Sequence, residues 1–149
     1  MKTQIIAAFP GTGKSYFAAE TSIDTVTDLD TNDYTQGYDE NGKVISTEFP
    51  DNYLTAIKQA IGQTNYLFVG CQPDVLNMLH EENIFPVLIY PQRQLKDEYM
   101  RRFQERGSSH EFSNLVYDNW DKFINYLEAQ NSERIVLKSG QYISDVIGK

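Results

Sequence analysis

The chain has 149 residues, 40% of them hydrophobic, and a formal net charge of −8 from 13 basic and 21 acidic residues. This composition excludes a disordered chain and predicts a single domain over residues 1–149, while the acidic balance disfavours long nucleic acid and anionic membrane surfaces as partners. The chain has one cysteine and no apolar stretch near the ~20 residues of a membrane helix, and its apolar N-terminal stretch is too short for a signal peptide. These features predict a cytoplasmic protein.

The first predicted element is a short apolar strand over 3–8, which runs into the sequence A-F-P-G-T-G-K-S at 8–15 and then into a helix over 14–20. A strand, a glycine-rich loop and a helix in this order are the setting of a phosphate-binding P-loop. One departure is Ala8, which stands where the motif usually has its first glycine. This position is the exit of the strand, where a small residue still permits a tight loop.

The chemistry of the P-loop follows from its residue types. Successive backbone N–H groups of residues 11–15 can point into one concavity and bind phosphate oxygens. Lys14 is predicted to place its charge on the β- and γ-phosphates of a nucleotide, and Ser15 to offer its hydroxyl to Mg²⁺. The predicted nucleotide-binding residues of this motif are Pro10, Gly11, Thr12, Gly13, Lys14, Ser15 and Tyr16.

A second strand is predicted over 25–29, and Asp28 and Asp30 lie at its end. Carboxylates two residues apart on an extended strand end share a face. One can hold Mg²⁺, usually through water, and the other can accept a hydrogen bond or a proton from a substrate hydroxyl. Aspartates are also common in the turns that end strands, so both interpretations stay open at this point.

A polar and aromatic segment follows over 31–50, with a hairpin-type turn at Asn41-Gly42. An irregular segment between packed elements is often a binding lobe, so we expect the phosphoryl acceptor to bind here. Tyr34 could stack on a base or simply wall this lobe. Lys43 is the single basic residue of the segment, which favours an acceptor hydroxyl over an acceptor phosphate.

The rest of the chain alternates helices and strands. Helices are predicted over 51–62, 74–82, 92–106, 112–130 and 142–147, and strands over 66–71, 85–90 and 134–137. This alternation predicts an α/β fold with a five-stranded parallel sheet flanked by helices. Ligands should then bind at the carboxyl ends of the strands, where Gly70 and Gln72 are further candidates to line an acceptor site.

The helix over 92–106 carries several arginines and leads into a Gly107–His110 tip. Arg102 and Arg106 are four residues apart, so they share a face of this helix. The pattern is typical of a short closing lid, predicted over 106–113, whose arginines stabilise a phosphoryl group in transfer. Ion pairing is the alternative, because Glu98 lies four residues before Arg102.

Together these residues resemble a small P-loop kinase of the nucleoside/nucleotide kinase superfamily. The resemblance rests on A-F-P-G-T-G-K-S, on D-L-D after the second strand, and on the arginine-bearing helix with its short lid. It covers nearly the whole chain in element order and implies a P-loop NTPase fold of the nucleotide kinase type. The run Y-P-x-R-x-L-K-x-E-Y at 90–99 is also similar to small nucleotide-kinase-like proteins of bacteriophages and some Gram-positive bacteria.

The resemblance also implies roles for the two aspartates. In shikimate and gluconate kinase types the first aspartate of D-x-D serves magnesium and the second serves the acceptor hydroxyl, which carries over as Asp28 and Asp30. The third predicted strand ends in V-G-C-Q at 69–72, without an acidic residue. In this interpretation Asp28 must take the metal role alone.

Further site residues follow from the same resemblance. The lid arginines of adenylate kinase-like proteins carry over as Arg102 and Arg106, with Arg93 as an additional substrate-binding residue. The loop after the last strand, with Ser139 and Gly140, occupies the place where such kinases hold adenine.

The sequence therefore predicts ATP- and Mg²⁺-dependent phosphoryl transfer to a small acceptor, foremost a nucleoside or a nucleotide. A second hypothesis is a nucleotide-binding regulatory module with little or no turnover, which the missing acidic residue at the third strand end motivates. A third is a kinase acting on nucleic-acid ends, against which the net charge of −8 counts. The identity of the acceptor, ATP versus GTP as donor, and the oligomeric state are left open.

Overall fold

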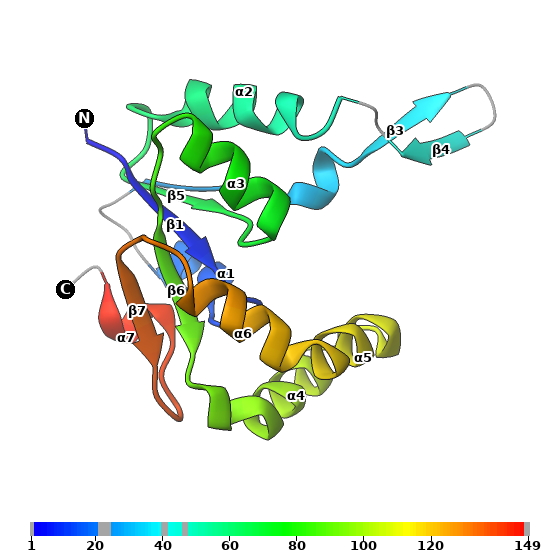
Figure 1. Cartoon of the computed structure of the whole chain (residues 1–149), viewed down its shortest axis with the longest axis vertical. Coiled ribbons are helices and arrows are strands. Elements are labelled where there is room, and N and C mark those ends of the chain that lie inside the picture. Colours follow the sequence, from blue (N-terminus) through cyan, green and yellow to red (C-terminus); the bar gives the residue numbers. More distant parts are fainter. Residues whose placement is uncertain (1, 21–24, 40–41, 46–47, 148–149) are drawn as a thin grey trace.

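A computed structural model of the chain describes residues 2–20, 25–39, 42–45 and 48–147. Its centre is a five-stranded, all-parallel sheet in the order β2-β5-β1-β6-β7 (Figure 1). The strands are β1 (Gln4–Ala8), β2 (Val26–Asp28), β5 (Tyr66–Val69), β6 (Val87–Pro91) and β7 (Arg134–Leu137). The predicted α/β fold with a five-stranded parallel sheet is confirmed.

Strands β1 and β5 form because their apolar runs can be buried on both faces of the sheet. The side chains of Ile6, Ala7, Ala8, Leu67, Phe68 and Val69 are all buried. Such continuous runs are typical of parallel strands covered by helices on either side. The register pairs Ala7 with Val69 and Ala8 with Ile89, so the residues that follow β1 and β5 emerge at the same edge of the sheet.

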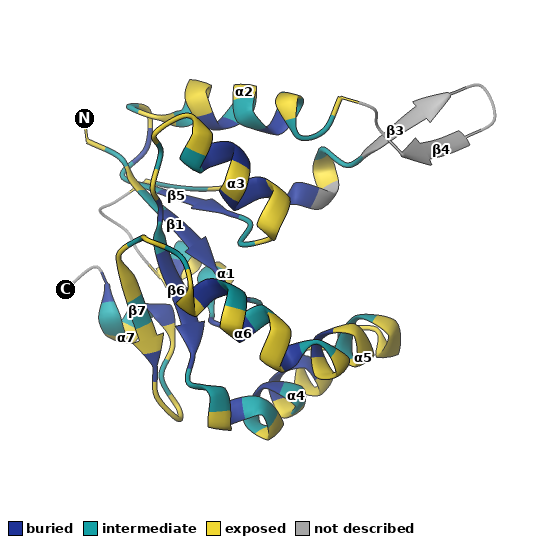
Figure 2. Ribbon diagram, in the orientation of Figure 1, coloured by how far each residue is buried: buried dark blue, intermediate teal, exposed yellow. Residues whose placement is uncertain are grey.

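Helices cover both faces of the sheet (Figures 1 and 2). The helices are α1 (Lys14–Glu20), α2 (Asp51–Ala60), α3 (Pro73–Glu81), α4 (Lys96–Glu105), α5 (His110–Asp118), α6 (Trp120–Glu128) and α7 (Ile143–Val146), with short 3₁₀ turns η1 (Thr31–Asp33) and η2 (Arg93–Leu95). Because strand side chains alternate, Ala7 joins a cluster with residues of α2, α3, α4 and α6, and Ile6 joins one with residues of α1 and α7.

The helix predicted over 112–130 is wrong as a single helix. The chain leaves helical geometry at Asn119, which has φ −114° and ψ 14°, and this residue separates α5 from α6. The Asn119 side chain donates a hydrogen bond to the carbonyl of Leu115 at 2.8 Å, a local bond that competes with the helical ladder. The predicted tip is also shorter, because α5 begins at His110 with Ser109 as its N-cap.

Other boundaries differ by a few residues. The strand predicted over 85–90 is Val87–Pro91, and the helix predicted over 92–106 is divided into η2 and α4. The hairpin strands β3 (Gln36–Asp39) and β4 (Gly42–Ile45) pair antiparallel in a small separate sheet, which projects from the body of the molecule in Figure 1. Asn41 of the predicted turn lies outside the described residues.

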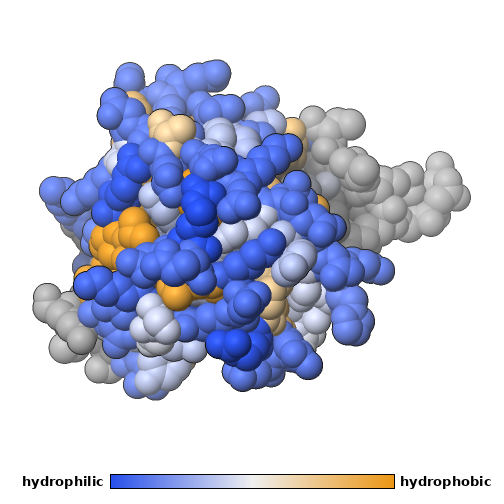
Figure 3. Space-filling model, turned by 60° about the horizontal axis from the view of Figure 1, so that its bottom comes forward, coloured by the Kyte–Doolittle hydropathy of each residue, from blue (hydrophilic) through white to orange (hydrophobic). Residues whose placement is uncertain are grey.

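Figure 3 shows the molecule with the lower side of Figure 1 turned toward the viewer. This face is mainly hydrophilic, with small separate apolar areas. Within the described ranges, none of the helices combines the length and the apolar character that crossing a membrane would need.

Candidate functional site

A cavity of about 1000 Å³ opens at the carboxyl edge of the sheet. Its wall is formed by residues 8–15 after β1, residues 29–31 after β2 and residues 70–73 after β5, together with side chains from α4, α5 and α6 and with Tyr142. Parallel strands direct their following loops to one edge, which is where ligands bind in open α/β sheets. The predicted phosphate-binding loop therefore lies where the fold places a ligand.

The loop between β1 and α1 has the backbone shape that its glycines permit. Gly11 and Gly13 have φ of +82° and +89°, a left-handed conformation that other residues rarely adopt. The buried Thr12 holds the loop from within, because its hydroxyl donates to the carbonyl of Phe9 at 2.7 Å. The carbonyl of Thr12 accepts a hydrogen bond from the backbone N–H of Ile143 at 2.9 Å, which ties the loop to α7.

Packing requires the same two glycines. A Cβ at Gly11 would lie 2.9 Å from the ring of Phe103, and a Cβ at Gly13 would lie 2.8 Å from the ring of Tyr142. Both distances are too short for carbon atoms, so any side chain would displace the aromatic wall around the loop. Ala8, which replaces the usual first glycine, is the last residue of β1 and is buried, with space for its methyl group.

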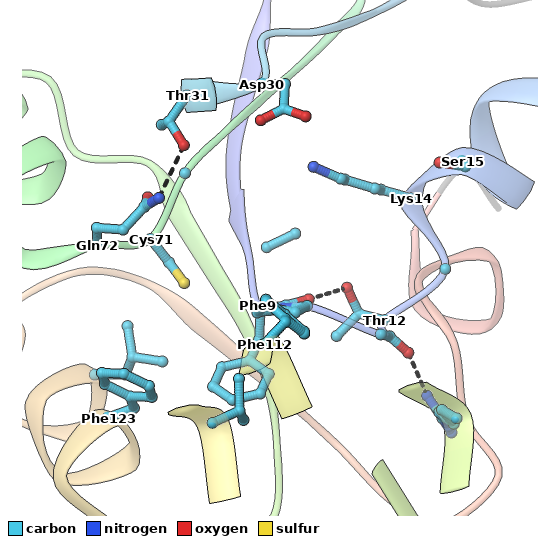
Figure 4. A pocket seen from close by; sticks show the side chains of 18 of the residues that line it. Phe9, Thr12, Lys14, Ser15, Asp30, Thr31, Cys71, Gln72, Phe112 and Phe123 are labelled. Atoms are coloured by element: carbon cyan, nitrogen blue, oxygen red, sulfur yellow. Dashed lines mark hydrogen bonds between the residues drawn. The ribbon is translucent and has the colours of Figure 1, made fainter. Parts of the chain in front are cut away.

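Lys14 and the two aspartates lie close to one another at this edge. The Lys14 ammonium forms an ion pair with the Asp28 carboxylate at 3.3 Å, and both side chains are about one-third exposed. Asp30 lies beyond the end of β2 and lines the cavity, and Figure 4 shows the Lys14 amino group pointing toward it. Ser15 lines the same part of the wall.

Mg²⁺ prefers carboxylate, hydroxyl, water and phosphate oxygens, and the described residues contain no group of three or more His, Cys, Asp or Glu that could hold a metal ion by themselves. Ser15 and Asp30 offer such oxygens on the cavity wall, whereas the Asp28 carboxylate is engaged by Lys14. A magnesium role for Asp28 would therefore require that ion pair to open, and the role stays a prediction.

Tyr53 of α2 joins the ends of β2 and β5, a role that the sequence did not suggest. Its hydroxyl donates to the carbonyl of Leu29 and accepts from the backbone N–H of Gly70 at 3.1 Å. Burial raises the pKa of Tyr53, so the hydroxyl stays protonated. A tyrosine on the otherwise apolar buried face of a helix is the signal that could have pointed to this role, because a buried phenol needs a partner.

A second bridge joins the same two loops. The side-chain amide of Gln72 donates to the hydroxyl of Thr31 at 2.9 Å, drawn as a dashed line in Figure 4. Gly70 leaves room for this bridge, because a Cβ there would meet the Gln72 amide oxygen at 2.0 Å. Asp30 is thus presented from a loop that is held on both sides.

Arg102 is buried between two loops. Its guanidinium donates to the carbonyls of Gly11 at 2.8 Å and Gln141 at 3.1 Å, and to the Glu98 carboxylate at 3.0 Å. It also stacks between the rings of Tyr99 and Tyr142, with its central carbon 4.4 and 4.0 Å from the ring centres. The pairing with Glu98, which the sequence left as an alternative, is present, and Arg102 positions the loop over 8–15 against the 138–142 loop.

Arg106 lies at the cavity wall in a different setting. Its side chain is exposed, packs over the rings of Phe103 and Phe112, and donates to the hydroxyl of Ser108 at 2.7 Å. Both predicted lid arginines line the cavity, but only Arg106 is exposed, and its contact with a bound phosphate stays a prediction. The closing motion of the lid stays a prediction.

The structure places Arg93 outside the cavity. Its guanidinium contacts α6, through Asp121 at 2.9 Å and Glu128 at 3.2 Å, and its carbonyl accepts from the Trp120 indole at 2.9 Å. Arg93 therefore anchors α6, and we do not include it among the residues proposed to contact the substrate.

Tyr34 and Tyr16 are also absent from the described cavity wall. Tyr34 packs its ring against Tyr53 with the centroids 5.1 Å apart, and its predicted role toward the acceptor stays a prediction. Tyr16 is 58% exposed on α1. Of the predicted acceptor lobe over 31–50, Thr31 lines the cavity, whereas the side chains of 36–47 lie outside the described residues.

Glu98 of α4 organises the loop after β7. Its carboxylate accepts from the Ser139 hydroxyl at 2.5 Å and from the backbone N–H of Gly140 at 3.1 Å. The Ser139 bond is the largest cause that lowers the pKa of Glu98, and Gly140 and Arg102 lower it further, against burial, which raises it. Ser139 and Gly140 do not line the described cavity, so their adenine-binding role stays a prediction.

No protein-family model matches this chain, and a comparison with curated proteins finds no match either. What the chain does must therefore be inferred from the residues of the site.

Proposed function

We propose that this chain is a P-loop phosphotransferase of the nucleoside/nucleotide kinase type, which moves the γ-phosphoryl group of ATP to a small acceptor, a nucleoside or a nucleotide. One observation carries the proposal. A loop with left-handed Gly11 and Gly13 follows the central strand of a parallel sheet and opens on a cavity whose wall holds Lys14, Ser15 and Asp30.

Each of these residues has a distinct task. The backbone N–H groups of the loop bind phosphate oxygens, and Lys14 leaves Asp28 to neutralise the charge of the phosphates. Ser15, together with Asp28 once Lys14 has left it, would hold Mg²⁺, which when bound neutralises charge on the β- and γ-phosphates. Asp30 orients the acceptor hydroxyl, and Arg106 adds a second cation. Positioning and charge neutralisation supply most of the rate in such transfers.

The test is release of ADP from ATP with Mg²⁺ against a panel of nucleosides, deoxynucleosides, their monophosphates and polyhydroxy acids. We expect one class of acceptor to stimulate release, and Lys14→Ala to abolish the stimulation. Lys58→Ala is the matched control, because Lys58 forms a surface pair with Glu82 away from the cavity. Stimulation that survives in Lys14→Ala would contradict the proposal.

A nucleotide-binding module without turnover is the second candidate. It is favoured by the loop after β5, where Cys71 and Gln72 line the cavity in place of a carboxylate. This candidate predicts that Mg²⁺ and ATP bind tightly while no acceptor in the panel stimulates ADP release. The two candidates are separated by the same measurement.

A further inference from the structure

Three consecutive carbonyl groups of the loop after β1 are engaged by hydrogen bonds. The carbonyl of Gly11 accepts from the Arg102 guanidinium at 2.8 Å. The carbonyl of Thr12 accepts from the backbone N–H of Ile143 at 2.9 Å. The next carbonyl, that of Gly13, accepts the first backbone bond of α1 at 3.0 Å. The directions of these three carbonyls are therefore set by α4, α7 and α1.

The peptide bond links the direction of each carbonyl to that of the N–H group that follows it. The peptide bonds of this loop are trans. Because a trans peptide unit is planar, its C=O and its N–H point in opposite directions. The N–H groups of residues 12, 13 and 14 therefore point away from the three donors. They are among the groups that the sequence predicts to bind phosphate oxygens.

Two of the three donors depend on the segment over 141–143, at the start of α7. Ile143 supplies its own backbone N–H to the loop. Arg102 is held by a second bond, from its guanidinium to the carbonyl of Gln141 at 3.1 Å. The Ile143 side chain is fully buried in the core, which fixes the main chain of the segment. The loop after β1 thus takes its shape in part from the C-terminal end of the chain.

Tyr142 contacts both sides of this arrangement. Its ring centre lies 4.0 Å from the central guanidinium carbon of Arg102, a cation–π contact. The same ring closes the space beside Gly13, where a Cβ would come within 2.8 Å of it. Tyr142 is 39% exposed and lines the cavity, so one part of the ring faces solvent while another covers the loop.

We propose that Tyr142 is a positioning residue for phosphate binding. Its ring keeps Arg102 and Gly13 in place, so that the N–H groups of residues 12–14 converge on one phosphate site. The inference rests on the proposed function, which requires phosphate at this loop. It gives Tyr142 a task toward the phosphates of the nucleotide and not toward its base, although Tyr142 belongs to the loop after β7, where the resemblance places adenine.

The physical reason is preorganisation. N–H groups that already converge bind an anion without a further ordering cost. A loop with glycines at 11 and 13 has many other conformations once its carbonyls are released. Loss of the Tyr142 ring should therefore weaken every ligand whose phosphates lie in the loop, and by a similar factor with and without a base.

The experiment compares ligands that differ in the base and in the phosphates. ATP and inorganic tripolyphosphate, each with Mg²⁺, and adenosine are titrated into the full chain and followed by calorimetry. Tyr142→Ala removes the ring, and Tyr142→Phe keeps it. Tyr117→Ala is the matched control, because Tyr117 is 50% exposed, covers the Lys96 ammonium at 3.7 Å and is not on the described cavity wall.

We expect Tyr142→Ala to weaken the binding of ATP and of tripolyphosphate by the same factor, about tenfold or more, since misplaced binding groups have costs of this size. Tyr142→Phe should restore both affinities to within about twofold of the unmodified chain. Tyr117→Ala should leave them unchanged within the same limit, because it alters an exposed side chain away from the cavity.

Amide hydrogen exchange of the chain without ligand gives a second readout, which does not depend on the strength of binding. Exchange over 9–15 should be faster in Tyr142→Ala than in the unmodified chain and in Tyr142→Phe, while exchange over α5 should not change. Tyr142→Leu, which keeps an apolar side chain of intermediate size, takes the place of Tyr142→Ala if that variant does not fold.

Two outcomes overturn the inference while leaving the proposed function intact. Weaker binding of ATP and adenosine with unchanged binding of tripolyphosphate would assign Tyr142 to the base. Unchanged affinities together with unchanged exchange over 9–15 in Tyr142→Ala would show that the ring does not position the loop. Failure of the unmodified chain to bind both ATP and tripolyphosphate with Mg²⁺ would instead refute the proposed function, and the inference with it.

Discussion

Arg102 lines the cavity, but its guanidinium is occupied by bonds that hold loops together, which a pattern of helix spacing does not reveal. Its spacing from Arg106 indicates a shared helix face, but the two side chains differ in how far they are exposed to solvent. Arg102 is 9% exposed and is bonded to Gly11, Gln141 and Glu98, whereas Arg106 is exposed at the cavity wall. We therefore expect Arg102 to act mainly by positioning these loops and Arg106 to be the better candidate for contact with phosphate, while the predicted catalytic role of both stays a prediction.

The first prediction separates these two arginines. Arg102→Lys should lower the free energy of unfolding by about 2 kcal/mol, because an ammonium cannot reproduce the planar fork that bonds Gly11, Gln141 and Glu98 together. Arg106→Lys should change stability by less than about 0.5 kcal/mol, since the side chain is exposed, and should lower kcat instead. Urea unfolding and steady-state kinetics of both variants are the measurements. Equal stability losses in the two variants would refute the assignment.

The second prediction concerns Asp30. Replacing it with Asn should lower kcat about 100-fold or more, because an amide cannot accept the acceptor proton, and should leave the ATP KM within about twofold. Asp33→Asn is the matched control, as Asp33 lies three residues further on and is not on the described cavity wall. An Asp30→Asn protein with undiminished turnover removes Asp30 from the mechanism.

Elements meet at the cavity through polar bridges that connect loops. Tyr53 on α2 joins the ends of β2 and β5, and the Thr31–Gln72 pair joins them a second time. These contacts span 17 to 41 residues in the chain, so no local pattern contains both partners. The ends of β2 and β5 follow from local sequence, whereas the distance between these two ends is fixed by Tyr53 of α2.

The third prediction tests the Tyr53 bridge. Tyr53→Phe should lower the free energy of unfolding by about 1–3 kcal/mol, because the Leu29 carbonyl and the Gly70 N–H are left without their hydroxyl partner. The acceptor KM should rise as the two loops loosen. Tyr34→Phe, in the neighbouring ring of the same cluster, should leave both quantities nearly unchanged. Thermal unfolding and acceptor titration measure the effect, and two indistinguishable variants would argue against the bridge.

The division between α5 and α6 shows a limit of periodicity at this scale. Apolar residues continue at helical spacing through Phe112, Val116, Trp120 and Leu127, which indicates one long helix. The break at Asn119 depends on a side chain that bonds the carbonyl four residues earlier. Periodicity describes which face is buried and carries no information on such a competing bond.

At the scale of the whole molecule, Glu98 connects three regions of the chain. From α4 it contacts Arg102, Ser139 and Gly140, and through Arg102 it is connected to Gly11 of the loop after β1. The loop after β7 and the loop after β1 are therefore held to each other by one carboxylate and one guanidinium.

The fourth prediction follows from the lowered pKa of Glu98. A carboxyl whose pKa is lower in the folded state stabilises the fold fully above its ordinary pKa of about 4.3. That stabilisation is lost as the pH falls through the pKa of the folded state. Glu98→Gln should thus be less stable than the unmodified chain at pH 7, and the difference should shrink toward pH 3. Urea unfolding at several pH values measures it, and a difference independent of pH would contradict the role.

The sequence by itself determined the α/β fold, the parallel sheet and the strand–loop–helix arrangement at residues 4–20, because apolar runs and glycine spacing act locally. It also brought Lys14, Ser15 and Asp30 to one edge, since parallel strands all end there. Only the tertiary structure decided that Arg102 is buried, that Arg93 faces α6, and that α5 and α6 wall the cavity. The reason is physical: these outcomes depend on packing between segments that are distant in the chain, and no local pattern records which of them will meet.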